Sequence, residues 1–358
     1  MKKLIKNNIA WVAGMVALLC LVAGCATQTP TTGNNYVFYP PPPNDPRLQF
    51  LVGFSSEKDF QGAQKKSFME YVTGEEQVNK GFSKPYGAAV YGKKLYVCDS
   101  DVGAVLVLDL QLKKIGVLET GGEGALSSPL NMTFDTDGSY YIADAGRNQV
   151  IIFNKDGSYA ATIGKAGEMN PRDVAVNQNR IYVADIKSHS VHVYDKATHN
   201  LLFDIPNSQD KTNVTHALFV PTNIALDSNG RLYASDTWAC HIQIYDADGN
   251  YIRTVGGLGN SPGQFARVKG VAVDRENRLY AVDAMSGVTQ IFDDKGQILT
   301  WFGDPQFQSL PAKVLIDYDD VSLFQSYAAP HFKIEYLVIV MNQLGPHKVS
   351  VYGFGEMK

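Results

Sequence analysis

Short runs of alternating apolar and polar residues recur between residues 85 and 302, and each run is long enough for one β-strand. One unit repeats: a Pro that opens an alternating run, a turn, a Tyr-containing run that ends in Asp, a short loop, a third alternating run and a Gly turn. Period-two alternation predicts strands, and the Asp-Gly and Asn-Gly pairs between runs predict tight hairpins. The copies of the second run are 95–99 (LYVCD), 140–144 (YYIAD), 181–185 (IYVAD), 232–236 (LYASD) and 279–283 (LYAVD).

The spacing of these units predicts the architecture. Units begin near residues 85, 129, 171, 221, 268 and 311, and the first four starts are 44, 42 and 50 residues apart. Periods of this size with several strands each are typical of propeller blades. One blade cannot bury both faces of its sheet, whereas a closed ring of blades can. We therefore predict an all-β fold, a six-bladed β-propeller of four-stranded antiparallel blades, as a single domain over residues 46–358.

The last unit lacks one strand. Its inner strand is predicted at 311–317, an insertion at 318–335 and two further strands at 336–341 and 348–352, after which the chain ends at Lys358. Residues 47–54 alternate like the predicted outer strands 251–256 and 298–303. We expect this N-terminal strand to complete the last blade and close the ring. The linker 55–83 is expected to hold one short helix over 65–79, which is rich in Glu, Lys and Gln.

The repeated unit resembles the NHL repeat, which reads P-x-G-V-A-V-D, then G-x-[IL]-Y-V-A-D, then V-x-V-F-D-x-x-G. The first copy here is PYGAAV at 85–90, LYVCD at 95–99 and VLVLD at 105–109, and the match extends to about residue 302. The resemblance implies a propeller that works as a binding or assembly module, presenting a rigid face to a protein, peptide or glycan.

The N-terminus reads as an export signal over residues 1–24. A basic start precedes an uncharged apolar stretch at 9–23, which is shorter than the roughly 20 residues that span a bilayer. The residues LVAGC at 21–25 resemble a bacterial lipobox, which implies that Cys25 carries the lipid (palmitate and diacylglycerol). Ala26 in place of Asp then favours a lipid-anchored position in the outer membrane, facing either the periplasm or the cell surface.

Residues 25–45 are rich in Thr, Asn and Pro and include four consecutive prolines at 40–43. A stretch of this composition cannot build a core, and a proline run favours extended polyproline II. We expect a semi-rigid tether between the lipid and the propeller.

The second residue after each blade start is predicted to line the central channel: Gly87, Asn131, Asp173, Asn223, Gly270 and Lys313. Asn131, Asp173 and Asn223 offer oxygen ligands that suit a hard divalent cation. Gluconolactonase-type propellers hold a metal with such side chains, but their Asn directly follows the Pro, where this chain has Leu130, Arg172 and Thr222. A metal-dependent hydrolase or lyase is therefore the alternative to the binding module, and a polar channel mouth without metal is the simpler interpretation. Arg172 and Lys269, next to their blade starts, would make that mouth basic and suited to an anionic ligand.

The Asp that ends each second run is interpreted as structural: Asp99, Asp144, Asp185, Asp236 and Asp283 are expected to accept hydrogen bonds from loop N–H groups. Four aromatic residues of the last-blade insertion form either a partner-docking surface or a lid on their own ring: Tyr318, Phe324, Tyr327 and Phe332.

Composition narrows the function classes further. The formal charge of −4 and the absence of a basic stripe argue against nucleic-acid binding. Cys98 and Cys240 fall on opposite sides of the predicted ring, so we expect no disulfide between them and a small buried side chain at Cys98. No nucleophile elbow, phosphate loop or paired-His metal motif occurs. The sequence thus predicts no catalytic residues, no cofactor and a monomer.

Overall fold

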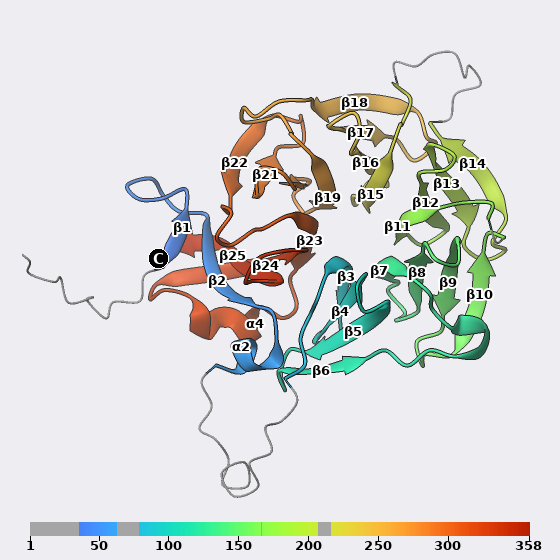
Figure 1. Cartoon of the computed structure of the whole chain (residues 1–358). Coiled ribbons are helices and arrows are strands. Elements are labelled where there is room, and N and C mark those ends of the chain that lie inside the picture. Colours follow the sequence, from blue (N-terminus) through green and yellow to red (C-terminus); the bar gives the residue numbers. More distant parts are fainter. Residues whose placement is uncertain (1–35, 63–78, 166, 207–215) are drawn as a thin grey trace, which may run out of the picture. The chain divides into compact units, whose positions relative to one another are not determined.

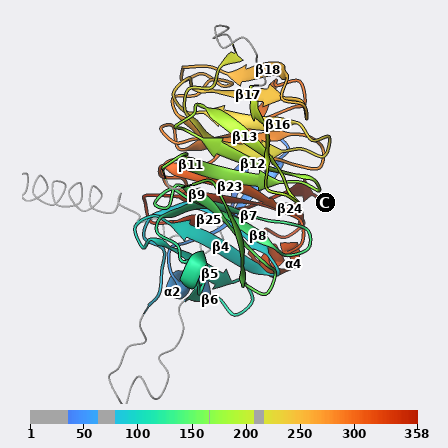
Figure 2. The same cartoon turned by 90° about the vertical axis from the view of Figure 1, so that its right-hand side faces the viewer.

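A computed structural model describes residues 36–62, 79–165, 167–206 and 216–358, and residues 36–358 belong to one compact unit. Six antiparallel sheets are arranged in a ring about a central axis (Figure 1), and Figure 2 shows the ring from its edge. The inner strand of each sheet contacts the inner strand of the next, and that of the last sheet contacts that of the first. The predicted six-bladed β-propeller is thus confirmed. No helix in these ranges is long and apolar enough to cross a bilayer.

The first five blades each contain four consecutive strands, numbered from the channel outward. Blade one has β3 (Pro85–Tyr91), β4 (Lys94–Asp99), β5 (Ala104–Asp109) and β6 (Lys114–Val117); blade two, after the 3-10 turn η1 (Gly122–Gly124), has β7 (Pro129–Phe134), β8 (Tyr140–Asp144), β9 (Gln149–Phe153) and β10 (Tyr159–Ile163). Blade three has β11 (Pro171–Val176), β12 (Arg180–Asp185), β13 (Ser190–Asp195) and β14 (Leu201–Ile205); blade four has β15 (Pro221–Leu226), β16 (Leu232–Asp236), β17 (His241–Tyr245) and β18 (Tyr251–Gly256). Blade five has β19 (Val268–Val273), β20 (Leu279–Asp283), β21 (Val288–Phe292) and β22 (Ile298–Phe302).

Blade six joins the two ends of the described chain. Its order is β23 (Pro311–Asp317), β24 (Phe332–Asn342), β25 (Val349–Met357), β2 (Leu48–Phe54) and β1 (Val37–Tyr39). β2 pairs with β25 from Leu48 opposite Phe354 to Phe54 opposite Val349. The predicted closing strand is therefore confirmed, and main-chain hydrogen bonds secure the ring.

The structure corrects the predictions for the tether and for the last-blade insertion. Val37–Tyr39 is a fifth strand rather than tether, and the proline run lies in the turn between β1 and β2 instead of forming an extended rod. β24 begins at Phe332, so the insertion is shorter than 318–335; it holds the short helix α4 (Val321–Phe324) and the 3-10 turn η3 (Gln325–Tyr327). Residues 65–78 of the predicted 65–79 helix lie outside the described ranges, so this helix stays a prediction. The helix described in this linker is α2 (Glu57–Gln61), N-capped by Ser56.

The core is divided among the blade interfaces. Six clusters of buried apolar side chains each combine residues from two neighbouring blades. One cluster, for example, packs Tyr141 and Ile152 of blade two against Val174 and Val183 of blade three. Because the side chains of a strand alternate between the two faces of its sheet, each blade contributes to two clusters. Cys98 in β4 is fully buried in one of them, as predicted, and both Cys98 and Cys240 are free thiols.

The recurring Asp has the predicted structural role. Asp144, for instance, accepts the backbone N–H groups of Ser127, Ser128 and Arg147 at 2.7, 2.9 and 3.0 Å. The other four do the same in their own blades. Each carboxylate therefore joins the loop entering its blade to the loop that follows the second strand.

In blade three this carboxylate also binds a histidine. His192 Nε2 lies 3.1 Å from Asp185 Oδ2, and Nδ1 lies 2.6 Å from Asp204 Oδ1. Burial raises the pKa of Asp185, but the hydrogen bonds from His192 and from backbone N–H groups outweigh it and lower the pKa to about 2. Burial lowers the pKa of His192, and the bonds to the two carboxylates reverse this, so that its net shift is upward.

This arrangement predicts a pH-dependent contribution to stability. Because the folded-state pKa of His192 is raised above the ordinary value of 6.5, the contribution is complete below that value and is lost as the pH rises through the folded-state pKa. His192→Asn should lower the free energy of unfolding by about 1–2 kcal/mol near pH 5.5 and by clearly less near pH 8.5. Urea denaturation at both pH values measures the difference, with exposed His331→Asn as the control. An equal loss at both pH values would show that protonation of His192 contributes nothing.

Candidate functional site

Every inner strand carries a β-bulge immediately after its first residue. In β11, Pro171 pairs with Asp185 while Asp173 pairs with Ala184, and the other five inner strands show the same kind of register shift at this point. A bulge redirects side chains locally. Its repetition in six blades gathers the second and third residues of all inner strands into one layer around the channel axis.

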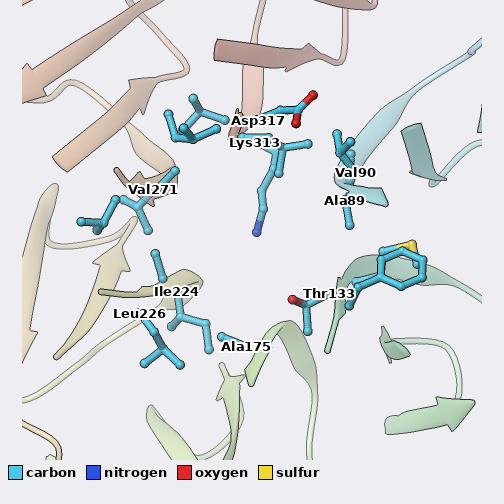
Figure 3. Close-up of a pocket in the computed structure, with 18 of the residues that line it drawn as sticks. Ala89, Val90, Thr133, Ala175, Ile224, Leu226, Val271, Lys313 and Asp317 are labelled. Atoms are coloured by element: carbon cyan, nitrogen blue, oxygen red, sulfur yellow. The ribbon is translucent and has the colours of Figure 1, made fainter. Parts of the chain in front are cut away.

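A charged pair occupies the middle of this layer. Lys313 Nζ of blade six donates to Asp173 Oδ2 of blade three at 2.7 Å, and the same oxygen accepts Ile224 N–H at 3.1 Å and Asn223 Nδ2 at 3.4 Å. Asp173 is fully buried and Lys313 is 6% exposed. Figure 3 shows the Lys313 side chain extending from its strand toward the centre of the channel.

Asn131 and two glycines complete the layer. Asn131 Nδ2 donates to the carbonyl oxygen of Arg172 at 3.0 Å. A Cβ atom on Gly87 would lie 1.9 Å from Asn131 Oδ1, and one on Gly270 would lie 2.5 Å from Lys313 Cα. Glycine is therefore required at both positions, because the neighbouring inner strand or its side chain already fills the space.

The layer does not fit a divalent metal. Its one carboxylate, Asp173, is neutralised by the ammonium group of Lys313, which lies where a cation would bind. Asn131 Oδ1 and Asn223 Oδ1 are buried without a hydrogen-bond partner, and such amide oxygens suit water or the donor groups of a ligand. Across the described residues no group of three or more His, Cys, Asp and Glu side chains is placed to hold a metal ion.

The structure thus brings Asn131, Asp173, Asn223 and Lys313 together but changes their interpretation. The sequence places them at the mouth of the channel, whereas all four are buried. Asn131 and Asn223 bond to the adjacent blade three, and Lys313 bonds to Asp173 across the channel. They form a layer that separates two halves of the channel. Arg172 and Lys269 lie on the side where the inner strands begin, which we call the entry side; the hairpins that follow the inner strands lie on the exit side.

The exit half of the channel is a cavity of about 420 Å³. All six inner strands line it, chiefly through Ala, Val, Ile and Leu side chains, and Thr133 and Lys313 are among its polar lining residues (Figure 3). Arg275, Asp317, Tyr318 and Asp319 lie at its rim. Although most of the lining side chains are apolar, polar atoms make up the larger part of the surface that the lining exposes to the cavity.

The aromatic insertion packs on its own ring. Phe324 and Phe332 are 0% and 2% exposed and belong to the core cluster between blades six and one, so they are unavailable to a partner and their prediction as partner contacts was wrong. The burial of these two aromatic side chains instead stabilises the interface between blades six and one, where the propeller closes. Tyr318 is partly buried and lies under the Arg275 guanidinium, 3.9 Å from its ring centre. The Tyr327 hydroxyl accepts a hydrogen bond from Lys113 at 2.7 Å.

A set of exposed apolar side chains on the entry side is not foreseen from the sequence. Trp238, Met285 and Leu344 are 75%, 65% and 51% exposed. Each is the second residue after the one that ends the second strand, which is Asp236, Asp283 or Asn342. Equivalent loops of three consecutive blades thus each present one large apolar side chain to solvent. An alignment of the repeats shows that these positions coincide, but not that the side chains are exposed.

Comparison with known proteins supports the fold. A family model described as a 6-bladed beta-propeller matches residues 115–205 and 212–298. No curated protein sequence matches the chain.

Several solved structures have the same fold at low sequence identity. A gluconolactonase from Xanthomonas campestris has a TM-score of 0.54 and 16% identity over 86% of this chain and 89% of its own. A virginiamycin B lyase from Staphylococcus aureus has a TM-score of 0.51 and 13% identity over 76% of this chain and 95% of its own. A protein of unknown function from Bacteroides thetaiotaomicron has a TM-score of 0.58 and 14% identity over 86% of this chain and 75% of its own.

Identities of this size carry the fold and leave the chemistry open, because propellers support both enzymes and binding modules. The strand order, the closed ring of inner strands and the matching family model agree. The chain is a six-bladed β-propeller.

Proposed function

We propose that this protein is a binding propeller of NHL-like repeats that holds a partner polypeptide against its entry side. The observation that carries the proposal is the exposure of Trp238, Met285 and Leu344 at equivalent loop positions of blades four, five and six. Large exposed apolar side chains gathered on one face are typical of protein-interaction sites, and Trp is among the residues that contribute most to binding. A rigid ring presents such loops without rearrangement, so binding costs little ordering entropy.

A metal-dependent hydrolase or lyase is the alternative function, since a gluconolactonase and a lyase have the same fold. The Lys313–Asp173 pair argues against it, because an ammonium group already neutralises the only carboxylate of the channel layer. No catalytic acid–base pair is proposed for this channel.

We also propose that the propeller is anchored to the bacterial envelope, in the outer membrane, through a lipid on Cys25. This rests on the basic start, the short apolar stretch and the LVAGC motif of the first 25 residues. A Cys25→Ser variant, which lacks the acceptor thiol, should lose radiolabelled palmitate and move from the membrane fraction to the soluble fraction. A Cys20→Ser variant, altered within the apolar stretch, is the control and should remain membrane-bound. Equal labelling of both variants would exclude Cys25 as the lipid site.

The channel pair gives a test of the metal alternative. Lys313→Met leaves the Asp173 carboxylate buried without a counter-charge and should lower the free energy of unfolding by about 3 kcal/mol or more. The double variant Lys313→Met with Asp173→Asn should recover most of this loss, because the uncompensated charge is gone. Chemical denaturation measures both. The unfolding midpoint of the wild type should not respond to calcium or zinc, and a clear rise with either ion would favour the enzyme instead.

Site-specific cross-linking tests the docking face. A photo-crosslinking phenylalanine analogue replaces Trp238 in whole cells, and in a matched control it replaces Trp301, an exposed Trp of the outer strand β22. We expect a discrete polypeptide adduct from position 238 and none from position 301. Trp238→Ala should weaken binding of the cross-linked partner, once purified, at least about tenfold. Equal cross-linking at both positions, or unchanged affinity in Trp238→Ala, would exclude this face.

A further inference from the structure

The beginnings of the inner strands are unbalanced in charge. The two positions that flank the first residue of each inner strand hold four basic residues and no acidic one across the six blades. The basic residues are Lys84, Arg172, Arg267 and Lys269. They come from blades one, three and five, which alternate around the ring, so their charges converge on the entry mouth. Beneath them Asp173 is already paired with Lys313 and cannot balance them.

Lys269 is the member of this group whose burial is hardest to explain. The residue is 6% exposed. Its Nζ donates to Gln343 Oε1 at 3.3 Å and lies 5.1 Å from the centre of the Tyr86 ring, which places it between blades six and one at the mouth. Burial, followed by the charges of Arg267 and Lys84, lowers the pKa of Lys269 to about 8. Neighbouring cations therefore repel this ammonium group, and no ion pair with a described carboxylate offsets the repulsion.

Other well-covered cations in the described ranges do have such partners. Lys313 pairs with Asp173 at 2.7 Å, Arg231 with Asp227 at 2.5 Å and Arg278 with Asp274 at 2.6 Å. An uncompensated buried charge is costly, and proteins normally pair it. A buried charge without a partner does not help the chain to fold, and such unfavourable arrangements are expected at functional sites.

Arg172 lies in the same region with its donors free. It is partly exposed, and its guanidinium makes no hydrogen bond or ion pair to any side chain or backbone group that the structure describes. Burial raises the pKa of the Tyr86 hydroxyl, the charges of Arg172 and Arg267 lower it, and the charge of Asp173 raises it, so all three charged groups act on this phenol. The ammonium group of Lys269 and the guanidinium groups of Arg172 and Arg267 thus join the Tyr86 hydroxyl at the entry mouth.

We propose that the entry mouth is an oxyanion-binding site in which Lys269 and Arg172 hold a carboxylate or phosphate group of the ligand. Arginine offers a planar pair of donors, and the ammonium of Lys269 adds a point charge that is shielded from water. The bound anion would supply the counter-charge that the folded chain lacks. This site uses other side chains than Trp238, Met285 and Leu344, so either proposal can fail without the other.

Calorimetric titration of the purified full-length protein with citrate and, separately, with inorganic phosphate tests the proposal at constant ionic strength. We expect saturable binding of at least one anion. Lys269→Gln keeps a neutral hydrogen-bond donor for Gln343 and should weaken that binding at least tenfold, and Arg172→Gln should weaken it similarly. Citrate binding alone indicates a carboxylate ligand, phosphate binding alone indicates a phosphorylated one, and both together fit the shared chemistry.

The matched control is Lys295→Gln, an exposed lysine in the β21–β22 turn of the same blade, on the exit side. Its affinity should equal that of the wild type. Thermal unfolding adds a second measurement: without anion, Lys269→Gln should unfold at the same or a higher temperature than the wild type, because it removes an uncompensated charge.

The absence of saturable binding, equal binding by Lys269→Gln and the wild type, or equal loss in all three variants would overturn the proposal. If Lys269→Gln does not fold, unchanged binding by Arg172→Gln overturns it instead.

Discussion

Each sheet of this protein has two apolar faces, and only neighbouring sheets cover them. The core is accordingly six separate clusters, one at each blade interface, rather than one central mass. Such a core is complete only when the ring is closed, and closure depends on the pairing of β2 with β25. Stacked aromatic side chains reinforce the interface between the last and first blades. The ring centres of Phe54 and Phe60 are 4.3 Å apart, and those of Phe60 and Phe324 are 5.9 Å apart. The insertion of blade six therefore contributes to ring closure.

The same closure explains the chemistry of the channel. Six inner strands converge on a narrow axis, and a bulge at the same place in each brings their second and third residues into one layer. Charges in that layer meet each other whether or not they are close in sequence. The Lys313–Asp173 pair satisfies this constraint, and the oppositely charged groups hold two facing blades together. Lys269 lies just outside the layer and has no described carboxylate partner. Because an uncompensated buried charge is costly, we expect an external anion to bind there.

The two sides of the ring consequently differ. The exit half of the channel is a cavity lined mostly by small and aliphatic side chains, with Arg275, Asp317 and Asp319 among its charged lining residues, whereas the entry side combines cations at the mouth with apolar side chains on the loops of blades four to six. A partner segment that carries both acidic and large apolar residues would match the entry side. Because the loops are held by buried carboxylates such as Asp144 and Asp236, this face is preformed before any partner arrives.

The sequence by itself determined the strands, the number of blades, the closing strand and the loop-binding role of the recurring Asp. All of these follow from period-two alternation and from a repeated order of turn residues, which are local properties of the chain. Only the tertiary structure decided that Lys313 reaches Asp173, because the two residues are 140 positions apart and meet only across a closed ring. It also decided that Phe324 is buried while Trp238 is exposed. Both are large apolar residues in segments outside the regular strands, and whether such a residue meets water depends on which neighbouring blade covers it.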